Sequence, residues 1–551
     1  MKKEKNIFGN LPVEIIDYIR LVIKKMNYRR RVCEDVAAEL AAHFEDELKD
    51  CKTDGDRQQK SKQIIENFGD PKLLGILLRR AKKRCRPLWR TALVRSLQAA
   101  GIFVLFLIVY SIWFLTGKPV ITTDYIAEFN RLVRPVADES RNAAPLYEKA
   151  IQLFKGSSDY NDIRQVFGKK YDEVTPEVKE RLEKRITENK AIFDLVIEGS
   201  AKPYYWRTYY IGDPNYGMMG ILKTELAEFR ELSQHLVWRA QLSAQQGRYE
   251  DSFNDLTACY RFGRHLRQGN ITLIEQLVGI AIEALSVQAI RDILDAHEID
   301  TAILAALQQD MEQAIAGESY VVNFTAEKLC AYEAIQRTFT DDSLTGGHLC
   351  LLGFSRALLA LTVSGSHSST DVMLGILPNI PYILFIHPNR KETKYMIERH
   401  YDFMEKVALK SPAQVRGEGT DIDEEAMKIV KGNLFLEVLS PAFSKVIEIS
   451  NRSKMDVQAT ITVIALQRYK NQNGQYPESF SDLVTAGYLK ELPIDPWSDK
   501  PLVYKKTDEG FTLYGIGINF IDDGGTMSLD NSGRPRLWQK NGDWVLWPVV
   551  K

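Results

Sequence analysis

The side chains best suited to catalysis are thinly spread along this sequence of 551 residues. Its eight histidines are scattered, and none pairs at short range with both a nucleophile and a carboxylate. The chain has no HExxH, GxSxG or P-loop motif, so the usual zinc-protease, serine-hydrolase and phosphate-binding signatures are missing. We therefore predict no catalytic or cofactor-binding residue. The partners of a catalytic triad can lie far apart in sequence, so a hydrolase stays open as an alternative.

Metal and redox sites are equally weak in the pattern. His43 and Glu47 lie four residues apart, but two ligands do not make a metal site, and a polar helix face explains both. The cysteines show no CxxC pair, which argues against a zinc knuckle or a thioredoxin-like site. They are Cys33, Cys51, Cys85, Cys259, Cys330 and Cys350. A disulfide between Cys330 and Cys350 is conceivable, but spacing alone does not establish it.

Two local clusters admit a structural and a functional interpretation. Thr420-Asp421-Ile422-Asp423 resembles a helix N-cap followed by an acidic first turn. That pattern accounts for the acids without a metal, namely Asp421, Asp423, Glu424 and Glu425. An aromatic run precedes Gly212-Asp213-Pro214 and is either a sugar-stacking surface or a packed loop. It consists of Tyr204, Tyr205, Trp206, Tyr209 and Tyr210.

The most prominent element is an uncharged run of 22 residues between Arg95 and Lys118. As a helix it spans about 33 Å, enough for a hydrocarbon core of about 30 Å. Residues 79–95 carry eight basic and no acidic residues. Because Lys and Arg are retained on the cytoplasmic side, we expect a single-pass cell-membrane protein with its N-terminus inside and its C-terminus outside. The run starts too late for a cleavable signal peptide, so we expect an uncleaved signal-anchor.

Charge supports this topology. Residues 1–96 hold 23 Lys and Arg against 14 Asp and Glu, whereas the remainder holds 49 against 59. The basic end adjoins the apolar run, which indicates membrane topology rather than nucleic-acid binding. A second uncharged stretch, 372–389, has Pro378, Asn379 and Pro381 at its centre. Burial in the outer domain, a dip into the outer leaflet and a second span all remain open for it.

The expected fold is mainly α with a C-terminal α+β module. We divide the chain into a cytosolic helical prefix (1–95), a transmembrane helix (96–117), an extracytoplasmic helical domain (118–450) and a β-rich module (451–551). In the third part, 236–269 reads as two helices meeting at Gln246–Tyr249, in the manner of one tetratricopeptide-type hairpin. A helical array and an irregular helical domain both fit. Residues 273–294 are apolar nearly all round and predict a central buried helix.

The prefix resembles a known helical module. Its VAAELAAHFEDEL segment, a polar turn and IIENFGDPKLLGILLRR are similar to the helical domain that is associated with anti-sigma factors and prefixed to bacterial permeases. The resemblance covers about 50 residues, and Phe68-Gly69-Asp70-Pro71 is its most specific part. It implies a small cytosolic unit that makes protein contacts without catalysis.

The C-terminal module resembles the globular end of the major pseudopilin of type II secretion systems. The match covers about 70 residues, and the elements that carry it are Asn473–Pro477, Leu492–Trp497, Lys500–Tyr504 and Gly517–Asn519. Unlike a pseudopilin, this chain places some 330 residues of helical domain before the module, which argues against assembly into a filament. We also expect strands at 502–504 and 511–514, and a hairpin at Asn541-Gly542 between RLWQK and DWVLW.

The pseudopilin resemblance implies one metal site. Pseudopilins of this kind hold calcium in the loop after the last matched strand, which corresponds here to NFIDDGGTMSLDN. Asp522, Asp523 and Asp530 would supply hard oxygen ligands, and Gly524-Gly525 would let the loop curl around the ion. The alternative is a solvated turn in which Asp and Gly satisfy the backbone.

Together these patterns favour a non-catalytic bacterial envelope protein, anchored in the membrane, that binds proteins or surface polymers through its outer domains. The prefix would contact a protein partner on the cytosolic side. An anchored extracytoplasmic hydrolase is one alternative. A signal transducer that acts through the prefix is another.

Overall fold

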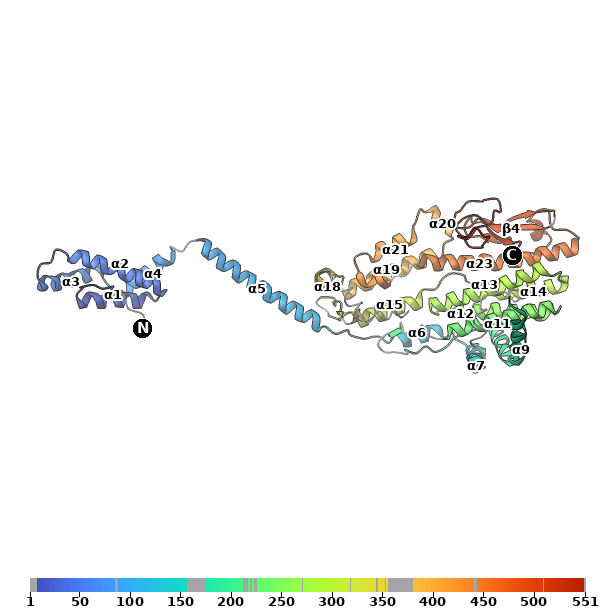
Figure 1. The fold of residues 1–551 in the computed structure, drawn as a ribbon, viewed down its shortest axis with the longest axis horizontal. Coiled ribbons are helices and arrows are strands. Elements are labelled where there is room, and N and C mark those ends of the chain that lie inside the picture. The colour runs from blue at the N-terminus through green and yellow to red at the C-terminus, as the bar shows by residue number, and fades with distance from the viewer. Residues whose placement is uncertain are drawn as a thin grey trace. The chain divides into compact units, whose positions relative to one another are not determined.

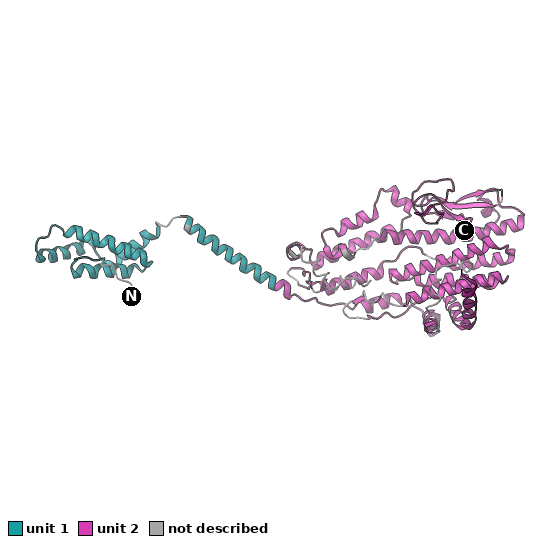
Figure 2. Ribbon diagram, viewed as in Figure 1, with its two compact units in different colours: residues 1–112 teal, residues 113–551 magenta. Residues whose placement is uncertain are grey.

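Helices make up most of the chain, and the sheets that the structure describes lie near its C-terminus (Figure 1). The mainly α prediction with a C-terminal sheet is thus confirmed at this level. The computed structural model describes residues 7–84, 88–155, 174–211, 217–218, 221, 225–269, 271–317, 319–342, 345–351, 353–354, 380–439, 443–508 and 510–549. Cys85, the turn at 212–214 and the part of the second apolar stretch from 372 to 379 lie outside these ranges. The chain divides into unit 1, residues 1–112, and unit 2, residues 113–551 (Figure 2).

Unit 1 contains four short helices with a core of their own, and then a long apolar helix. They are α1 (Val13–Met26), α2 (Arg30–Leu48), α3 (Asp54–Phe68), α4 (Pro71–Arg84) and α5 (Leu88–Thr116), whose last turn belongs to unit 2. Ile15, Ile19 and Phe44 are fully buried in the core of the short helices. Gly69 ends α3 at a φ of 75°, and the Tyr18 hydroxyl donates to its carbonyl at 3.0 Å.

Among the residues that the structure describes, two helices are long and apolar enough to cross a membrane. Residues Thr91–Thr116 of α5 have a mean hydropathy of 2.3, and only 6% of that window is buried in the chain. The second is α13 (Leu273–Ala296), with a mean hydropathy of 1.6 and 61% of its window buried. The second helix is therefore covered by protein, as predicted for 273–294, and the first is not.

Unit 2 is built on long helices that lie side by side (Figure 1). Its first half contains α6 (Tyr125–Val133), η1 (Glu139–Arg141), α7 (Ala144–Lys155), α9 (Pro176–Glu188), α10 (Lys190–Ser200), α11 (Leu226–Gln245), α12 (Tyr249–Arg267), α13, α14 (Thr301–Ile315) and α15 (Thr325–Thr338). Its second half contains α18 (Ile380–Phe385), α19 (Arg390–Ala408), α20 (Pro412–Gly417), α21 (Ile422–Val430), α22 (Leu434–Leu439), α23 (Phe443–Asn473) and α24 (Asp482–Thr485).

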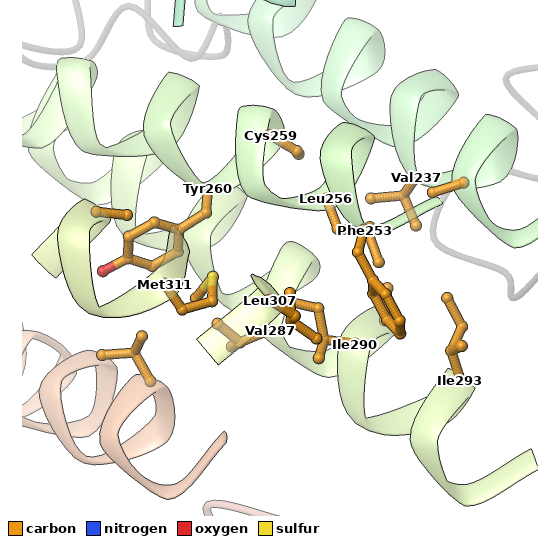
Figure 3. Close-up of a cluster of buried hydrophobic side chains, with 14 of the residues drawn as sticks. Val237, Phe253, Leu256, Cys259, Tyr260, Val287, Ile290, Ile293, Leu307 and Met311 are labelled. Atoms are coloured by element: carbon orange, nitrogen blue, oxygen red, sulfur yellow. The ribbon is translucent and has the colours of Figure 1, made fainter. Parts of the chain in front are cut away.

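The centre of unit 2 is the packing of α11, α12, α13 and α14. The expected turn at 246–249 joins α11 to α12, and Gly247 in it has a φ of 73°, which favours glycine. Phe253, Leu256 and Tyr260 of α12 pack with side chains of α13 and α14 in one buried cluster (Figure 3). Cys259, Cys330 and Cys350 are free thiols, so the conceivable disulfide is not formed.

The C-terminal strands make two small antiparallel sheets. The strands β1 (Ile494–Asp495) and β2 (Lys500–Pro501) form one. The other has the order β3 (Val503–Lys506), β4 (Phe511–Gly515), β5 (Trp544–Trp547). The expected strands at 502–504 and 511–514 correspond to β3 and β4, although Leu502 lies outside β3. The prediction of a hairpin at Asn541-Gly542 is wrong, because RLWQK forms no strand. Instead β5 pairs with β4, with Trp544 opposite Gly515.

The helix α23 ties this sheet to the helical part of unit 2. It runs without a break through the expected domain boundary at 450 and 451. On α13, Arg291 pairs with Asp456 of α23 at 2.7 Å, with side chains 1% and 6% exposed. Ser453 donates to Glu283 at 3.0 Å. The hydrophobic cluster around α12 and α13 continues through α23 to Leu513 and Trp544, so one core serves helices and sheet.

Removing one partner of the buried ion pair tests this arrangement. We expect Arg291→Leu to lower the free energy of unfolding of residues 113–551 by about 3–5 kcal/mol, because Asp456 is left charged or unpaired in the core. Burial already raises the pKa of Asp456 despite Arg291. Denaturant unfolding measures the effect.

The double variant Arg291→Leu with Asp456→Leu should recover most of the loss, since no buried charge then remains. Thr460 keeps its bond to the carbonyl of residue 456 in this variant. The exposed pair of Lys428 and Glu425 is the control, and Lys428→Ala should cost less than about 1 kcal/mol. A double variant as unstable as the single one would contradict the account.

Candidate functional site

The loop proposed for calcium lies after β4. Its carboxylates accept hydrogen bonds from the loop's own backbone and from neighbouring side chains. Asp522 Oδ1 accepts from the Tyr514 hydroxyl at 3.0 Å and from the Gly524 amide at 2.9 Å. Asp523 accepts from the Asn519 side chain at 2.7 Å. Asp530 accepts from the amides of residues 532 and 534, which lower its pKa. Each predicted ligand thus has a structural role.

The three predicted ligands are not gathered around one point. Asp522 and Asp523 lie near buried Asp543, whose pKa is raised by burial and then by these two carboxylates. Asp543 accepts from the amides of Asp523 and Gly525, so it fixes the loop from inside. Asp530 belongs to a separate turn. Within the described ranges, no group of three or more His, Cys, Asp or Glu side chains is placed to hold a metal ion.

A groove forms where α20 and α21 face the C-terminal module. Its volume is about 460 Å³. It is lined by Lys410, Pro412, Val415, Arg416, Gly419, Thr420, Asp421, Ile422, Ser444, Ile447, Glu448, Trp497, Ile518 and Phe520. We call this set the α20–α21 groove. Trp497 and Ile518 come from two of the motifs that carry the pseudopilin resemblance, so the module forms one wall.

Direct contacts fix the two walls of the α20–α21 groove. The Ala413 amide donates to the Pro496 carbonyl at 3.1 Å, and Ser411 donates to Asp499 at 2.9 Å. Ser411 also caps α20, where its hydroxyl accepts from the Gln414 amide. The N-terminus of α20 is therefore attached to the turn between β1 and β2.

The chemistry of the groove is that of a binding site. Its floor and walls are largely apolar, and its cations sit at defined places. Arg416 lies 4.3 Å from the ring centre of Phe520 and donates to the Asn519 carbonyl at 3.2 Å. Lys410 pairs with Glu418 at 2.7 Å. An apolar pocket with a few oriented polar groups, at a junction between two structural parts, is typical of ligand sites.

The acidic cluster beside the groove is a helix start, as the sequence predicted. Asp421 Oδ1 accepts from the Glu424 amide at 3.0 Å, and Asp423, Glu424 and Glu425 fill the first turn of α21. The Ser444 hydroxyl donates to Asp423 at 2.7 Å. No histidine is among the described lining residues of the groove.

Other residues singled out in the sequence have structural partners. His43 packs against the rings of Phe44 and Phe68. In the aromatic run, Trp206 and Tyr209 are 5% and 3% exposed and belong to the core, Tyr205 is partly buried against it, and Tyr204 is 37% exposed. Tyr210 is 77% exposed.

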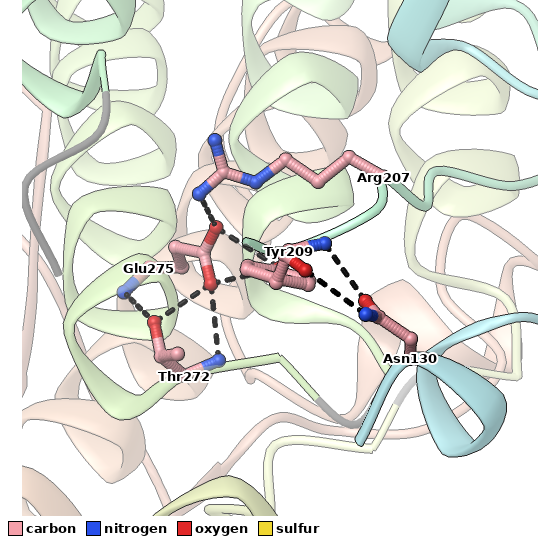
Figure 4. Close-up of polar contacts among 5 residues, drawn as sticks. All are labelled: Asn130, Arg207, Tyr209, Thr272 and Glu275. Carbon is pink, nitrogen blue, oxygen red and sulfur yellow. Dashed lines mark hydrogen bonds and ion pairs between the residues drawn. The ribbon is translucent and has the colours of Figure 1, made fainter. Parts of the chain in front are cut away.

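A buried polar cluster was missed by sequence reasoning. Arg207 pairs with Glu275, the Tyr209 hydroxyl donates to both oxygens of Glu275 at 3.0 and 3.1 Å, and Thr272 donates to the same carboxylate at 2.7 Å (Figure 4). Asn130 exchanges two hydrogen bonds with the Tyr209 backbone. Only the Thr272–Glu275 capping box was visible as a sequence pattern.

Glu327 lies beside this cluster, and its carboxyl has a raised pKa. Its Oε1 accepts from the Leu273 amide, and its other oxygen is buried with no hydrogen-bond partner in the structure. Burial raises its pKa to about 7, and Glu275 contributes to the rise. The Glu327 carboxyl lies at the start of α13, as the capping box does. When it ionises, its negative charge is therefore buried in the protein.

Comparison with known proteins adds no relative: no protein family, curated protein or solved structure matches the chain.

The raised pKa of Glu327 predicts a pH-dependent stability. Because the folded pKa of about 7 exceeds the unfolded value of 4.5, the wild type loses stability as the pH rises between these values. Glu327→Gln keeps an acceptor for the Leu273 amide but does not ionise. We expect the variant to gain up to about 3 kcal/mol relative to wild type between pH 4.5 and pH 8. Urea unfolding at several pH values measures this, and parallel stability curves would contradict it.

Proposed function

We propose that this protein is an envelope protein anchored in the bacterial membrane by α5 alone, with residues 1–95 in the cytosol and residues 118–551 outside. The observation that carries the proposal is the contrast between its two apolar helices. Only 6% of the α5 window is buried in the chain, against 61% for α13. An apolar helix that protein leaves uncovered is stabilised by lipid.

The charges of the two helices agree with this assignment. Within Thr91–Thr116 the one charged residue is Arg95, close to the end where the basic residues gather. In α13, by contrast, Glu275, Glu283 and Arg291 are each about 1% exposed and have ion-pair partners inside the protein. Such side chains are costly in lipid but are satisfied in a protein core. The basic flank before α5 supports a cytoplasmic N-terminus, because Lys and Arg are retained on that side.

We further propose that the outer part binds protein partners, and that it does so in the α20–α21 groove. The mostly apolar lining, the oriented Arg416 and the absence of a histidine among its described lining residues favour binding over catalysis. The resemblances of the prefix and of the C-terminal module support the same view. The prefix resemblance implies protein contacts without catalysis, and neither resemblance brings catalytic residues.

Reporter fusions test the anchor and its direction. Alkaline phosphatase fused after Lys551 should be active in cells, and a green fluorescent protein at the same place should stay dark. The full chain should also remain in membranes washed with carbonate at high pH. Leu105→Arg with Ile108→Arg should release it, because each charge at the centre of a span costs about 2.5–3.5 kcal/mol. An inactive phosphatase together with a fluorescent green fluorescent protein at the same place would contradict the proposal.

Peptide selection on residues 113–551 tests the groove. Peptides enriched from a displayed library should lose binding by about tenfold or more with Ile518→Lys, which places a cation in the apolar wall. Ile494→Lys on β1, where the side chain is 42% exposed outside the groove, is the matched control and should bind as wild type. Fluorescence anisotropy measures both. Equal binding by wild type and Ile518→Lys would place the site elsewhere, and enrichment of glycans alone would replace a protein partner with a surface polymer.

A further inference from the structure

The helix α4 carries apolar side chains on both of its faces. Leu74, Gly75 and Leu78 face the core of unit 1. On the opposite side, Leu73, Ile76 and Leu77 are 58%, 46% and 50% exposed. A helix that packs on a small domain normally turns polar residues outward, so this outer apolar stripe has no explanation in the folding of unit 1.

Close packing at Gly75 fixes which face of α4 points outward. A Cβ atom at this position would lie 2.8 Å from the Val22 carbonyl oxygen and 3.0 Å from the Met26 amide nitrogen, both at the C-terminal end of α1. Lys82 pairs with Glu39 of α2 at 3.3 Å on the same side of α4. The helix therefore cannot rotate to bury Leu73, Ile76 and Leu77 without losing this contact.

Cations share the outer face with these apolar residues. At 100° per residue, Arg80, Lys83 and Arg84 fall on the same side of the helix as the apolar stripe, and all three are exposed. No acidic residue occurs between Asp70 and Asp124. The outer face thus combines apolar side chains with positive charge alone, which is the composition of helices that lie in a membrane interface.

We propose that the outer face of α4, formed by Leu73, Ile76, Leu77, Arg80, Lys83 and Arg84, binds the anionic surface of the membrane in which the protein is anchored. The three apolar side chains enter the headgroup region, and the cations contact lipid phosphates. This inference rests on the proposed function in one respect: the proposed topology makes the cytoplasmic leaflet the surface that α4 meets.

Chain connectivity favours lipid over another protein as the occupant. Only residues 85–90 separate α4 from the candidate span that starts at Thr91, and residues 88–90 already belong to α5. Six residues reach at most about 20 Å even when fully extended. The helix is therefore held within that distance of the point where the chain would enter the bilayer. Such a tether gives a high effective concentration of the surface, so moderate intrinsic affinity is enough.

Vesicle sedimentation with residues 1–87 tests the proposal. This fragment contains all four short helices and their own core and lacks α5, so any binding comes from the folded surface. We expect it to sediment with vesicles that contain phosphatidylglycerol and to stay in solution with pure phosphatidylcholine. Leu73→Ser, Ile76→Ser and Leu77→Ser together should weaken binding by about tenfold or more. Arg80→Glu, Lys83→Glu and Arg84→Glu together should weaken it at least as much, since each cation contributes about fivefold.

The control is Val13→Ser with Leu21→Ser. These two residues of α1 are 69% and 38% exposed and lie outside the outer face of α4, so the variant should bind as wild type. Circular dichroism shows that each variant is folded. Equal binding by the serine triple variant and wild type, or no binding of wild type to anionic vesicles, would overturn the proposal. So would a wild-type dimer that the triple variant converts to a monomer, because a second copy would then cover the face.

The outcome of vesicle binding can be told apart from the outcome of the carbonate wash that tests the anchor. If the fragment binds vesicles but carbonate releases the full chain from membranes, the proposed function fails and the surface remains. If the full chain stays in membranes and the fragment ignores vesicles, the reverse holds.

Discussion

The burial of α23 against α13 is the contact on which the rest of unit 2 depends. Arg291 and Asp456 are ionised groups removed from water, and each is acceptable there only because the other lies 2.7 Å away. Glu283 lies on α13 about two turns before Arg291. It accepts a hydrogen bond from Ser453 of α23 and pairs with Arg267 at 2.7 Å. Polar contacts of this kind have strict geometry, so they set the register of α23 along α13 more sharply than apolar packing alone.

The position of α23 determines the groove. The first two turns of this helix supply Ser444 and Ile447 to the groove. Its later turns pack against the C-terminal module, whose turns supply Trp497 and Ile518. The opposing α20 is then attached through Ser411 and Ala413. A ligand in the groove would contact both parts at once, so its binding would be coupled to the packing of the sheet on α23. The C-terminal module therefore forms one wall of the α20–α21 groove and also belongs to the main core of unit 2.

Sequence reasoning succeeded where the signal is local. The uncharged run of α5, the N-cap at Asp421 and the turn between α11 and α12 are each encoded within a few residues. The buried nature of α13 followed from its apolar composition, but its three buried charged residues found partners that sequence spacing does not reveal. Arg291 and Asp456 lie 165 residues apart, and Glu275 is joined by Arg207 and Tyr209 from a loop.

One prediction failed because it rested on a local signal alone. Asn541-Gly542 does turn the chain, with Gly542 at a φ of 79°, yet β5 pairs with β4, and Trp544 lies beside Trp497 in the core. The boundary expected at residues 450 and 451 stays a prediction, although α23 runs through it without a break. The calcium site also stays a prediction, and its three carboxylates accept from groups of the loop and its neighbours.

Native-state hydrogen exchange of residues 113–551 shows whether the helices and the sheet of unit 2 form one cooperative structure. Amides in α13, α23 and β4 should exchange with the same free energy of opening and the same dependence on denaturant. If β4 and β5 exchanged at much lower free energy while α13 stayed protected, the sheet would be a separately folding module, and the account would be contradicted.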